Sequence, residues 1–264
     1  MFCIAGIKAL LFSAVTAPVL RYYTNPAGVK FVYIGPGKFE MGNQHKPNEC
    51  RPVKISGFWL SVTPVTNKQF EYLVPKHKRG KYTPRDSQPV TDVRYVDALR
   101  YAKLSQVKFG RHYRLPTAAE WEYAARGGRQ DWDFPWGNSE TDFPQMKDTT
   151  DLTPANVASF PPNAYGLYDL ICEVEEWVLD DSFVLSINFE NSKLVTNPLY
   201  LNQDRKTTDG MVKGSYWGNL DYVYGFAPGY RDITQEDCDF YGFRLVMTKV
   251  PTKFTKICFI YHPR

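Results

Sequence analysis

Aromatic side chains and turns together place the strongest limit on how this chain can fold. The 264 residues include 18 Tyr, 17 Phe and 6 Trp, and after residue 128 turn-forming residues recur between them every few positions. Large aromatic rings carry much of the apolar area that a core buries. Gly, Pro, Asn and Asp at this density interrupt long helices and strands. The sequence therefore predicts a folded domain with an aromatic core and little regular secondary structure.

The composition excludes several classes of protein. Charged residues make up 23% of the chain and hydrophobic residues 43%, which argues against a disordered chain, a coiled coil and a multi-span membrane protein. The net charge of +4 is small and no block of Lys or Arg concentrates it, so we expect no nucleic-acid partner. The five cysteines lack the CxxC spacing of zinc sites, and their pairing stays open.

Three helices and several short strands are predicted from local signals. Capping boxes begin two helices after Thr66 and Thr117, of which the first stops after Val74 and the second at the pair that begins with Gly127. A third helix is expected from about Val96 to Val107, before the stop at Gly110. Short strands are expected at residues 31–34, 58–60 and 243–246 and from Lys253 onward. This mixture predicts the α+β class.

Both ends of the chain are apolar. Residues 1–22 form an N-terminal arm whose uncharged run, Ala9 to Leu20, is shorter than the roughly 20 residues of a membrane-spanning helix. A packed arm and a signal peptide or anchor both remain open. We expect a domain at residues 23–248 and a C-terminal tail at 249–264. The tails are expected to pack against a neighbouring copy or against the domain itself, and no membrane span is expected.

Five blocks, in order, resemble the formylglycine-generating enzyme family, also called sulfatase-modifying factor domains. They are FVYIGPGKFEMGN (31–43), FWLSVTPVTNKQF (58–70), YRLPTAAEWEYAARGG (113–128), FPPNAYGLYDL (160–170) and the pair KGSYWGN (213–219) with YGFRLV (241–246). The resemblance covers about residues 24–247. It implies a C-type-lectin-like fold of the α+β class, with few regular elements and long loops.

The resemblance also implies a catalytic site that this chain lacks. The enzymes of the family use two cysteines after the Gly-Ser-Tyr motif to bind copper and oxidise a substrate cysteine. Here Gly218 and Val223 occupy those positions. Neither side chain can bind a metal or act as a nucleophile. We therefore expect no copper and favour a non-catalytic protein, although an enzyme with another catalytic set remains an alternative.

A structural calcium site is implied in the segment that follows the motif Gly-Leu-Tyr. The implied ligands are the side chains of Asp169 and Glu176 and the backbone carbonyls of Cys172 and Val174. The alternative is a solvated acidic turn formed by Glu173, Glu175 and Glu176. The family's other calcium loop, near residues 155–157, lacks its downstream acidic partner here.

Other residues of the matched blocks are expected to have structural roles. Arg114 is expected to pair with Glu120, Trp121 to fill the core, and Arg244 to be a buried and paired strand residue. The segment from Tyr216 to Tyr241 is instead the expected binding face, because irregular loops rich in Tyr suit recognition. Its candidate ligand-binding residues are Trp217, Asn219, Asp221, Tyr222, Tyr224, Phe226, Tyr230 and Arg231. The alternative is that these aromatic residues belong to the core.

The favoured function is a non-catalytic binding or structural module, a surface or virion component that recognises a protein or glycan on a surface. Variable proteins of diversity-generating retroelements place their diversified residues at the corresponding part of this fold. The alternatives are a diverged enzyme of the family, acting as an oxidase or maturation factor, and a calcium-dependent carbohydrate binder. An extracellular, cell-surface or virion location is favoured over the cytoplasm.

Overall fold

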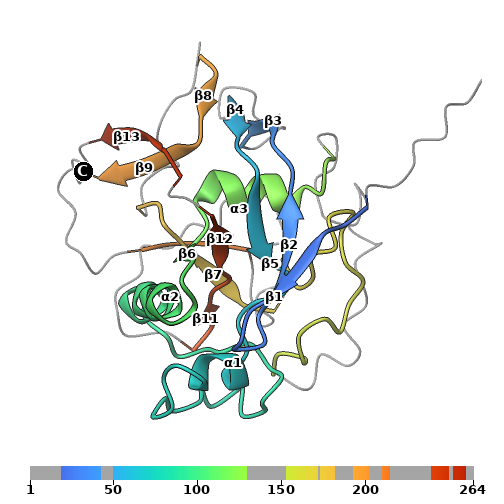
Figure 1. The fold of residues 1–264 in the computed structure, drawn as a ribbon, viewed down its shortest axis with the longest axis vertical. Helices are drawn as coiled ribbons and strands as arrows, with labels where there is room; N and C mark the ends of the chain where they lie inside the picture. Colours follow the sequence, from blue (N-terminus) through green and yellow to red (C-terminus); the bar gives the residue numbers. More distant parts are fainter. Residues whose placement is uncertain are drawn as a thin grey trace, which may run out of the picture.

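A computed structural model describes residues 19–42, 50–129, 153–171, 173–181, 193–202, 210–214, 239–249 and 252–259. Within these residues the chain forms four small sheets and three helices, joined by long irregular connections (Figure 1). This mixture of short elements confirms the α+β class and the small share of regular structure.

The largest sheet has five strands, and each neighbouring pair is antiparallel. In spatial order its strands are β1 (Tyr22–Thr24), β2 (Lys30–Ile34), β5 (Phe58–Ser61), β12 (Val246–Thr248) and β6 (His112–Arg114). The strands expected near the start of the domain therefore form. Because β1 and β12 share one sheet, the two ends of the domain meet there.

Three smaller sheets complete the strands of the described residues. They are β3 (Gly37–Met41) with β4 (Arg51–Ile55) and β8 (Val195–Thr196), β10 (Met211–Lys213) with β7 (Glu175–Val178) and β11 (Tyr241–Gly242), and β9 (Pro198–Asn202) with β13 (Thr255–Phe259). The parallel pair of β9 and β13 confirms the expected C-terminal strand (Figure 1). This part of the tail thus packs on its own chain.

The three helices are α1 (Asn67–Glu71), α2 (Tyr95–Phe109) and α3 (Ala118–Ala125). Both predicted capping boxes form: the side chains of Thr66 and Thr117 accept the backbone N–H groups of Gln69 and Glu120, whose own side chains reach back to the caps. Gly110 ends α2 in the left-handed conformation, as its position predicts. No helix in the described ranges is long and apolar enough to cross a bilayer.

The first helix is shorter than predicted. It ends at Glu71, and the N–H groups of Leu73 and Val74 both donate to the carbonyl of Phe70. The bond from Leu73 spans only three residues, so the turn before Pro75 is tighter than regular α-helix.

The predicted strand at 243–246 is also displaced. The ladder bonds are made by β11 before this stretch and by β12 at its end. Between them, the carbonyls of Phe243 and Leu245 accept the N–H groups of Val65 and Ser61. The backbone here connects two sheets, and this arrangement leaves the Arg244 side chain in the interior.

The interior is rich in aromatic residues, as the composition predicts. Two apolar clusters form, one around Trp121 and the other around Tyr101 and Phe243. In the second cluster the rings of Phe70 and Tyr101 are stacked, with centroids 5.0 Å apart. The fully buried aromatic side chains of the described residues are Trp121, Tyr95, Tyr101, Tyr200, Phe31, Phe58 and Phe243.

Candidate functional site

A buried ion pair joins Arg244 of the last motif block to Glu176 of the segment in which calcium was expected. Glu176 projects from β7, and Arg244 lies between β11 and β12. Arg244 Nε donates to Glu176 Oε2 at 2.6 Å and Nη2 donates to Oε1 at 2.7 Å. Trp121 Nε1 adds a third hydrogen bond, to Glu176 Oε2 at 2.7 Å. Both oxygens of the carboxylate thus accept hydrogen bonds from side-chain donors within the core.

The structural roles expected for these blocks are confirmed. Arg244 is buried and paired, and Trp121 is buried in the core. Arg114 Nη1 and Glu120 Oε2 are 2.6 Å apart in a partly buried ion pair. Because Glu120 also completes the cap of α3, this pair ties the start of the helix to β6.

Asp169 and Glu173 anchor the neighbouring loop through its backbone. The N–H of Ala158 donates to Asp169 Oδ2 at 2.7 Å, and the N–H of Ala155 donates to Glu173 Oε2 at 3.0 Å. Asp169 Oδ1 is buried and has no hydrogen-bond partner in the described part of the chain. An unsatisfied buried carboxylate oxygen is costly, so this atom marks a place where a cation or a proton would be stabilised.

The pKa values of the Asp169 and Glu173 carboxyl groups are both raised towards neutral pH. Burial raises the pKa of Asp169 to about 6, against the opposing effects of the Ala158 N–H and the charge of Arg244. Burial and the nearby charge of Asp169 raise the pKa of Glu173 to about 8. A bound cation would favour the ionised form of both groups.

The predicted calcium ligands are only partly brought together. Asp169 has an open oxygen, whereas both oxygens of Glu176 accept hydrogen bonds from Arg244 and Trp121. Val174 is buried, and Cys172 lies outside the described residues. Across the described ranges, acidic, His and Cys side chains alone do not converge in a group of three. Calcium at this set therefore stays a prediction.

The alternative of a solvated acidic turn is wrong. Glu173, Glu175 and Glu176 expose only 2%, 6% and 0% of their surface. The run of acidic residues looked like an exposed turn in sequence. In the structure, the pairing of β7 with β10 and β11 places Glu175 and Glu176 inside the domain.

A second buried charge cluster includes Lys213, which comes shortly before the expected binding face in the sequence. Lys213 Nζ lies 3.3 Å from Glu122 Oε2, and Arg126 Nη2 lies 2.8 Å from Glu122 Oε1. Burial lowers the pKa of Lys213, although Glu122 opposes this effect. The cluster fixes β10 against α3, and Gly214 follows β10 with a φ of 91°. The cluster therefore holds the end of β10 against α3.

The residues assigned to recognition lie outside the described residues. They are Trp217, Asn219, Asp221, Tyr222, Tyr224, Phe226, Tyr230 and Arg231, and the same holds for Gly218 and Val223. At the end of this segment Tyr241 is buried and packs on Trp177, with ring centroids 5.2 Å apart. This one aromatic residue therefore belongs to the core.

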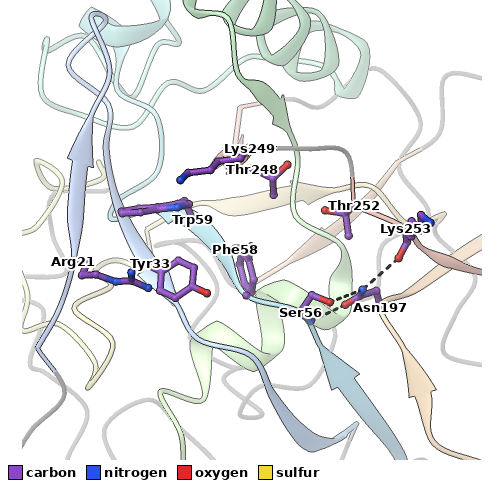
Figure 2. A pocket seen from close by; sticks show the side chains of 11 residues that line it. Arg21, Tyr33, Ser56, Phe58, Trp59, Asn197, Thr248, Lys249, Thr252 and Lys253 are labelled. Atoms are coloured by element: carbon purple, nitrogen blue, oxygen red, sulfur yellow. Dashed lines mark hydrogen bonds between the residues drawn. The ribbon is translucent and has the colours of Figure 1, made fainter.

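A pocket on the five-stranded sheet was not anticipated from the sequence. It has a volume of about 650 Å³. Its described lining residues are Arg21, Tyr33, Ser56, Gly57, Phe58, Trp59, Asn197, Thr248, Lys249, Thr252 and Lys253, and we call it the Trp59 pocket (Figure 2). One signal could have pointed to it: Tyr33 and Trp59 occupy the partly exposed positions of two strands whose neighbouring residues are buried, and they pair directly across β2 and β5.

The short sheets, the long connections and the buried Arg–Glu centre define an α+β domain of the C-type-lectin-like class. A sequence model described as the sulfatase-modifying factor enzyme 1-like domain matches residues 17–249. The chain therefore belongs to this family, which the five motif blocks had predicted.

Curated relatives and solved structures agree with this assignment. The chain is 32% identical to the formylglycine-generating enzyme of Bos taurus over 85% of its own length and 59% of the relative's. It is 29% identical to the inactive C-alpha-formylglycine-generating enzyme 2 of Bos taurus, over 58% of the chain and 71% of that relative. It thus spans little more than half of the bovine enzyme.

Two solved structures share the fold over most of their length. PvdO from Pseudomonas aeruginosa superposes with a TM-score of 0.63 at 25% identity, covering 86% of this chain and 97% of PvdO. Variable protein 1 of Treponema denticola superposes with a TM-score of 0.64 at 21% identity, covering 87% of this chain and 99% of that protein. The second likeness concerns the fold alone.

Proposed function

We propose that this chain is a non-catalytic binding or structural module of the formylglycine-generating enzyme-like family. The observation that carries the proposal is chemical: Gly218 and Val223 stand where the family's enzymes have their two cysteines. Without thiolates at these positions, the chain has no soft ligands for Cu(I) there and no thiol to exchange with a substrate cysteine. A relative named as inactive supports a module that has lost the reaction and kept the fold.

The recognition surface that we propose is the segment from Tyr216 to Tyr241. Its Tyr-rich composition supports contacts with a protein or a glycan on a surface, because Tyr offers a large amphipathic area at a low entropic cost. The buried cluster of Lys213 with Glu122 supports this role, since it holds β10, which precedes the segment in the sequence, against α3. We propose an extracellular, cell-surface or virion location for such a module, with assembly contacts through its tails.

Copper binding and oxygen uptake test the non-catalytic proposal. The full chain is titrated with Cu(I) without oxygen, and then supplied with oxygen, a thiol reductant and a cysteine-containing peptide. We expect no stoichiometric copper, no peptide-dependent oxygen uptake and no mass change of the peptide. The matched variant Gly218→Cys/Val223→Cys is expected to acquire one tight Cu(I) site. Stoichiometric copper with turnover in the unmodified chain contradicts the proposal and favours a diverged oxidase.

We also propose that Ca²⁺ stabilises the turn around Asp169. The open Oδ1 of Asp169 and the adjacent carboxyl of Glu173 support this, because hard cations prefer carboxylate and carbonyl oxygens. The Arg244 guanidinium already neutralises Glu176, so we assign the side-chain ligands to Asp169 and Glu173 and the remaining ligands to backbone carbonyls such as those of Cys172 and Val174. The ion would supply structural charge compensation.

A further inference from the structure

The Trp59 pocket has the size of a small-ligand site. Its volume of about 650 Å³ lies within the range of about 300–1,000 Å³ that is typical of such sites. Side chains converge on it from β2, β5 and the segments after β12 and before β9 (Figure 2). Residues from both ends of the described domain therefore build one cavity.

Basic side chains surround the pocket without acidic partners. Arg21, Lys249 and Lys253 line it, and no Asp or Glu of the described residues does. No ion pair joins these three cations to a carboxylate within the described ranges. The charged side chains of the described lining are therefore all positive, which favours an anion in the pocket.

Arg21 is held in place by an aromatic ring. Its guanidinium carbon lies 4.0 Å from the centroid of the Tyr33 ring. Stacking on an aromatic face leaves the N–H edges of a guanidinium available for an anion in the plane of the group. The arginine is thus oriented before any ligand arrives, which lowers the entropic cost of binding.

Two hydroxyl oxygens of the pocket wall, on the side away from Arg21, accept hydrogen bonds (Figure 2). Asn197 Nδ2 donates to Ser56 Oγ at 3.0 Å, and Arg114 Nη2 donates to Thr252 Oγ1 at 3.0 Å. Each hydroxyl oxygen already accepts a hydrogen bond, so its own hydrogen remains for another acceptor. The backbone N–H of Ser56 is bonded to Asn197 Oδ1 at 2.8 Å, which fixes Ser56 at the pocket wall (Figure 2).

Aromatic rings form another part of the pocket wall. The rings of Tyr33 and Trp59 lie with centroids 5.5 Å apart and planes at 58°. Phe58 is buried beside them. Partly exposed aromatic rings at such an angle offer a corner into which a planar ring or the face of a sugar can pack.

We propose that the Trp59 pocket binds a small anionic ligand in which a carboxylate or sulfate group is attached to a ring whose face can pack on an aromatic side chain. The oxyanion is held by the basic side chains of the lining, of which Arg21 lies beside Tyr33 and Lys249 beside Trp59 (Figure 2), while the ring packs on Trp59 and Tyr33. Charge-assisted hydrogen bonds to an oriented guanidinium provide strength and direction. An aryl acid and an acidic sugar share this chemistry. The site uses none of the residues of the proposed recognition segment. A failed test of the pocket would therefore leave the proposed function unchanged, and the reverse also holds.

Isothermal titration of the full chain with matched probes tests the proposal. The aromatic arm compares 4-nitrobenzoate with neutral 4-nitrobenzamide, and the sugar arm compares a sulfated heparin disaccharide with neutral lactose. We expect saturable binding of at least one anion, at least tenfold tighter than its neutral counterpart. Binding of the benzoate alone identifies an aryl acid as the ligand class, and binding of the disaccharide alone identifies an acidic sugar.

Two charge-matched triple variants locate the binding. Arg21→Gln/Lys249→Gln/Lys253→Gln is expected to weaken the anion at least tenfold, because it removes the cations of the pocket. The control Lys68→Gln/Lys103→Gln/Lys108→Gln changes the net charge equally at exposed positions of α1 and α2, and is expected to bind as the unmodified chain does. No saturable binding of either anion, equal binding of the neutral probes, or equal loss in both variants overturns the proposal.

Discussion

Arg244 and Glu176 form a fully buried ion pair in which Nε and Nη2 donate to the two carboxylate oxygens at 2.6 and 2.7 Å. The same guanidinium donates to the carbonyls of Ser61 at 3.1 Å and Tyr168 at 2.9 Å. Arg244 therefore joins the end of β5, the turn before Asp169 and strand β7. Three segments that are distant in sequence are held together by one side chain.

Removing the arginine is expected to destabilise the domain strongly. Arg244→Met leaves the Glu176 carboxylate buried with Trp121 as its remaining side-chain donor, and an uncompensated buried charge costs about 3–5 kcal/mol. Urea unfolding at neutral pH measures the loss. The control is Arg94→Gln, which breaks the exposed Arg94–Asp97 pair and is expected to cost at most about 1 kcal/mol. Equal losses in the two variants would contradict the central role of Arg244.

Gly214 is expected to resist substitution because of its backbone and its neighbours. Its φ is 91°, and an added Cβ would lie 3.0 Å from the carbonyl of Leu170 and 3.4 Å from the Trp121 ring. Gly214→Ala is expected to lower the free energy of unfolding by about 1–3 kcal/mol. Gly28→Ala is the control, since Gly28 also has a positive φ but has open space around it. Chemical denaturation should show the larger loss for Gly214; a larger loss for Gly28 would refute this account.

The parts of the fold that depend on local chemistry could be predicted from the sequence. The capping boxes at Thr66 and Thr117 and the stop at Gly110 each need only residues within one helical turn, so the pattern contains the whole cause. The family pattern added Arg244, whose partner lies far away in the sequence, by analogy with related proteins.

Features made by distant segments could not be predicted from local patterns. The parallel pairing of β13 with β9 leaves no local signal, because its hydrogen bonds join separate parts of the chain. The Trp59 pocket likewise needs Arg21, Trp59 and Lys253 to meet. Local polarity was also misleading at Glu175, since charged residues usually mark an exposed turn and here β7 is inside.

The cap of α3 offers a test of helix stability near the ion pair of Arg114. Thr117 is fully buried, and its Oγ1 accepts the N–H of Glu120 at 3.1 Å. Thr117→Ala leaves this N–H without its partner and is expected to cost about 1–2 kcal/mol in thermal or urea unfolding. Thr117→Ser keeps the oxygen and should retain most of the stability. A serine variant as unstable as the alanine variant would point to packing instead of capping.

Asp180 is expected to make stability fall as the pH rises. Burial raises its pKa from the ordinary 3.8 to about 7, against the Ala118 and Tyr200 N–H groups that favour the charged form. Because the folded-state pKa is the higher one, the contribution of Asp180 is complete below about pH 4 and is lost as the pH rises through 7. Between about pH 4 and 7, the free energy of unfolding should fall by about 1.4 kcal/mol per pH unit relative to that of the Asp180→Asn variant. Urea unfolding at several pH values measures this difference.

The control for this pH dependence is Glu71, a carboxylate whose pKa is shifted in the opposite direction. The hydrogen bond from Arg79 lowers the pKa of Glu71, so its stabilisation is present at neutral pH and is lost as the pH falls. The difference in unfolding free energy between the protein and Glu71→Gln should therefore shrink in acid. A difference for Asp180→Asn that stays constant from pH 4 to 7 would contradict the raised pKa.

Calcium is expected to stabilise the protein through Asp169 and Glu173. Millimolar Ca²⁺ at neutral pH should raise the midpoint of thermal unfolding, because an ion that binds only the folded state shifts the equilibrium towards it. Asp169→Asn/Glu173→Gln keeps oxygens that can accept the N–H groups of Ala158 and Ala155 but removes both charges, and should abolish the shift. Mg²⁺, which demands tighter octahedral geometry, serves as the control ion. An unchanged midpoint with Ca²⁺ or chelator, or a full shift in the double variant, would rule out this site.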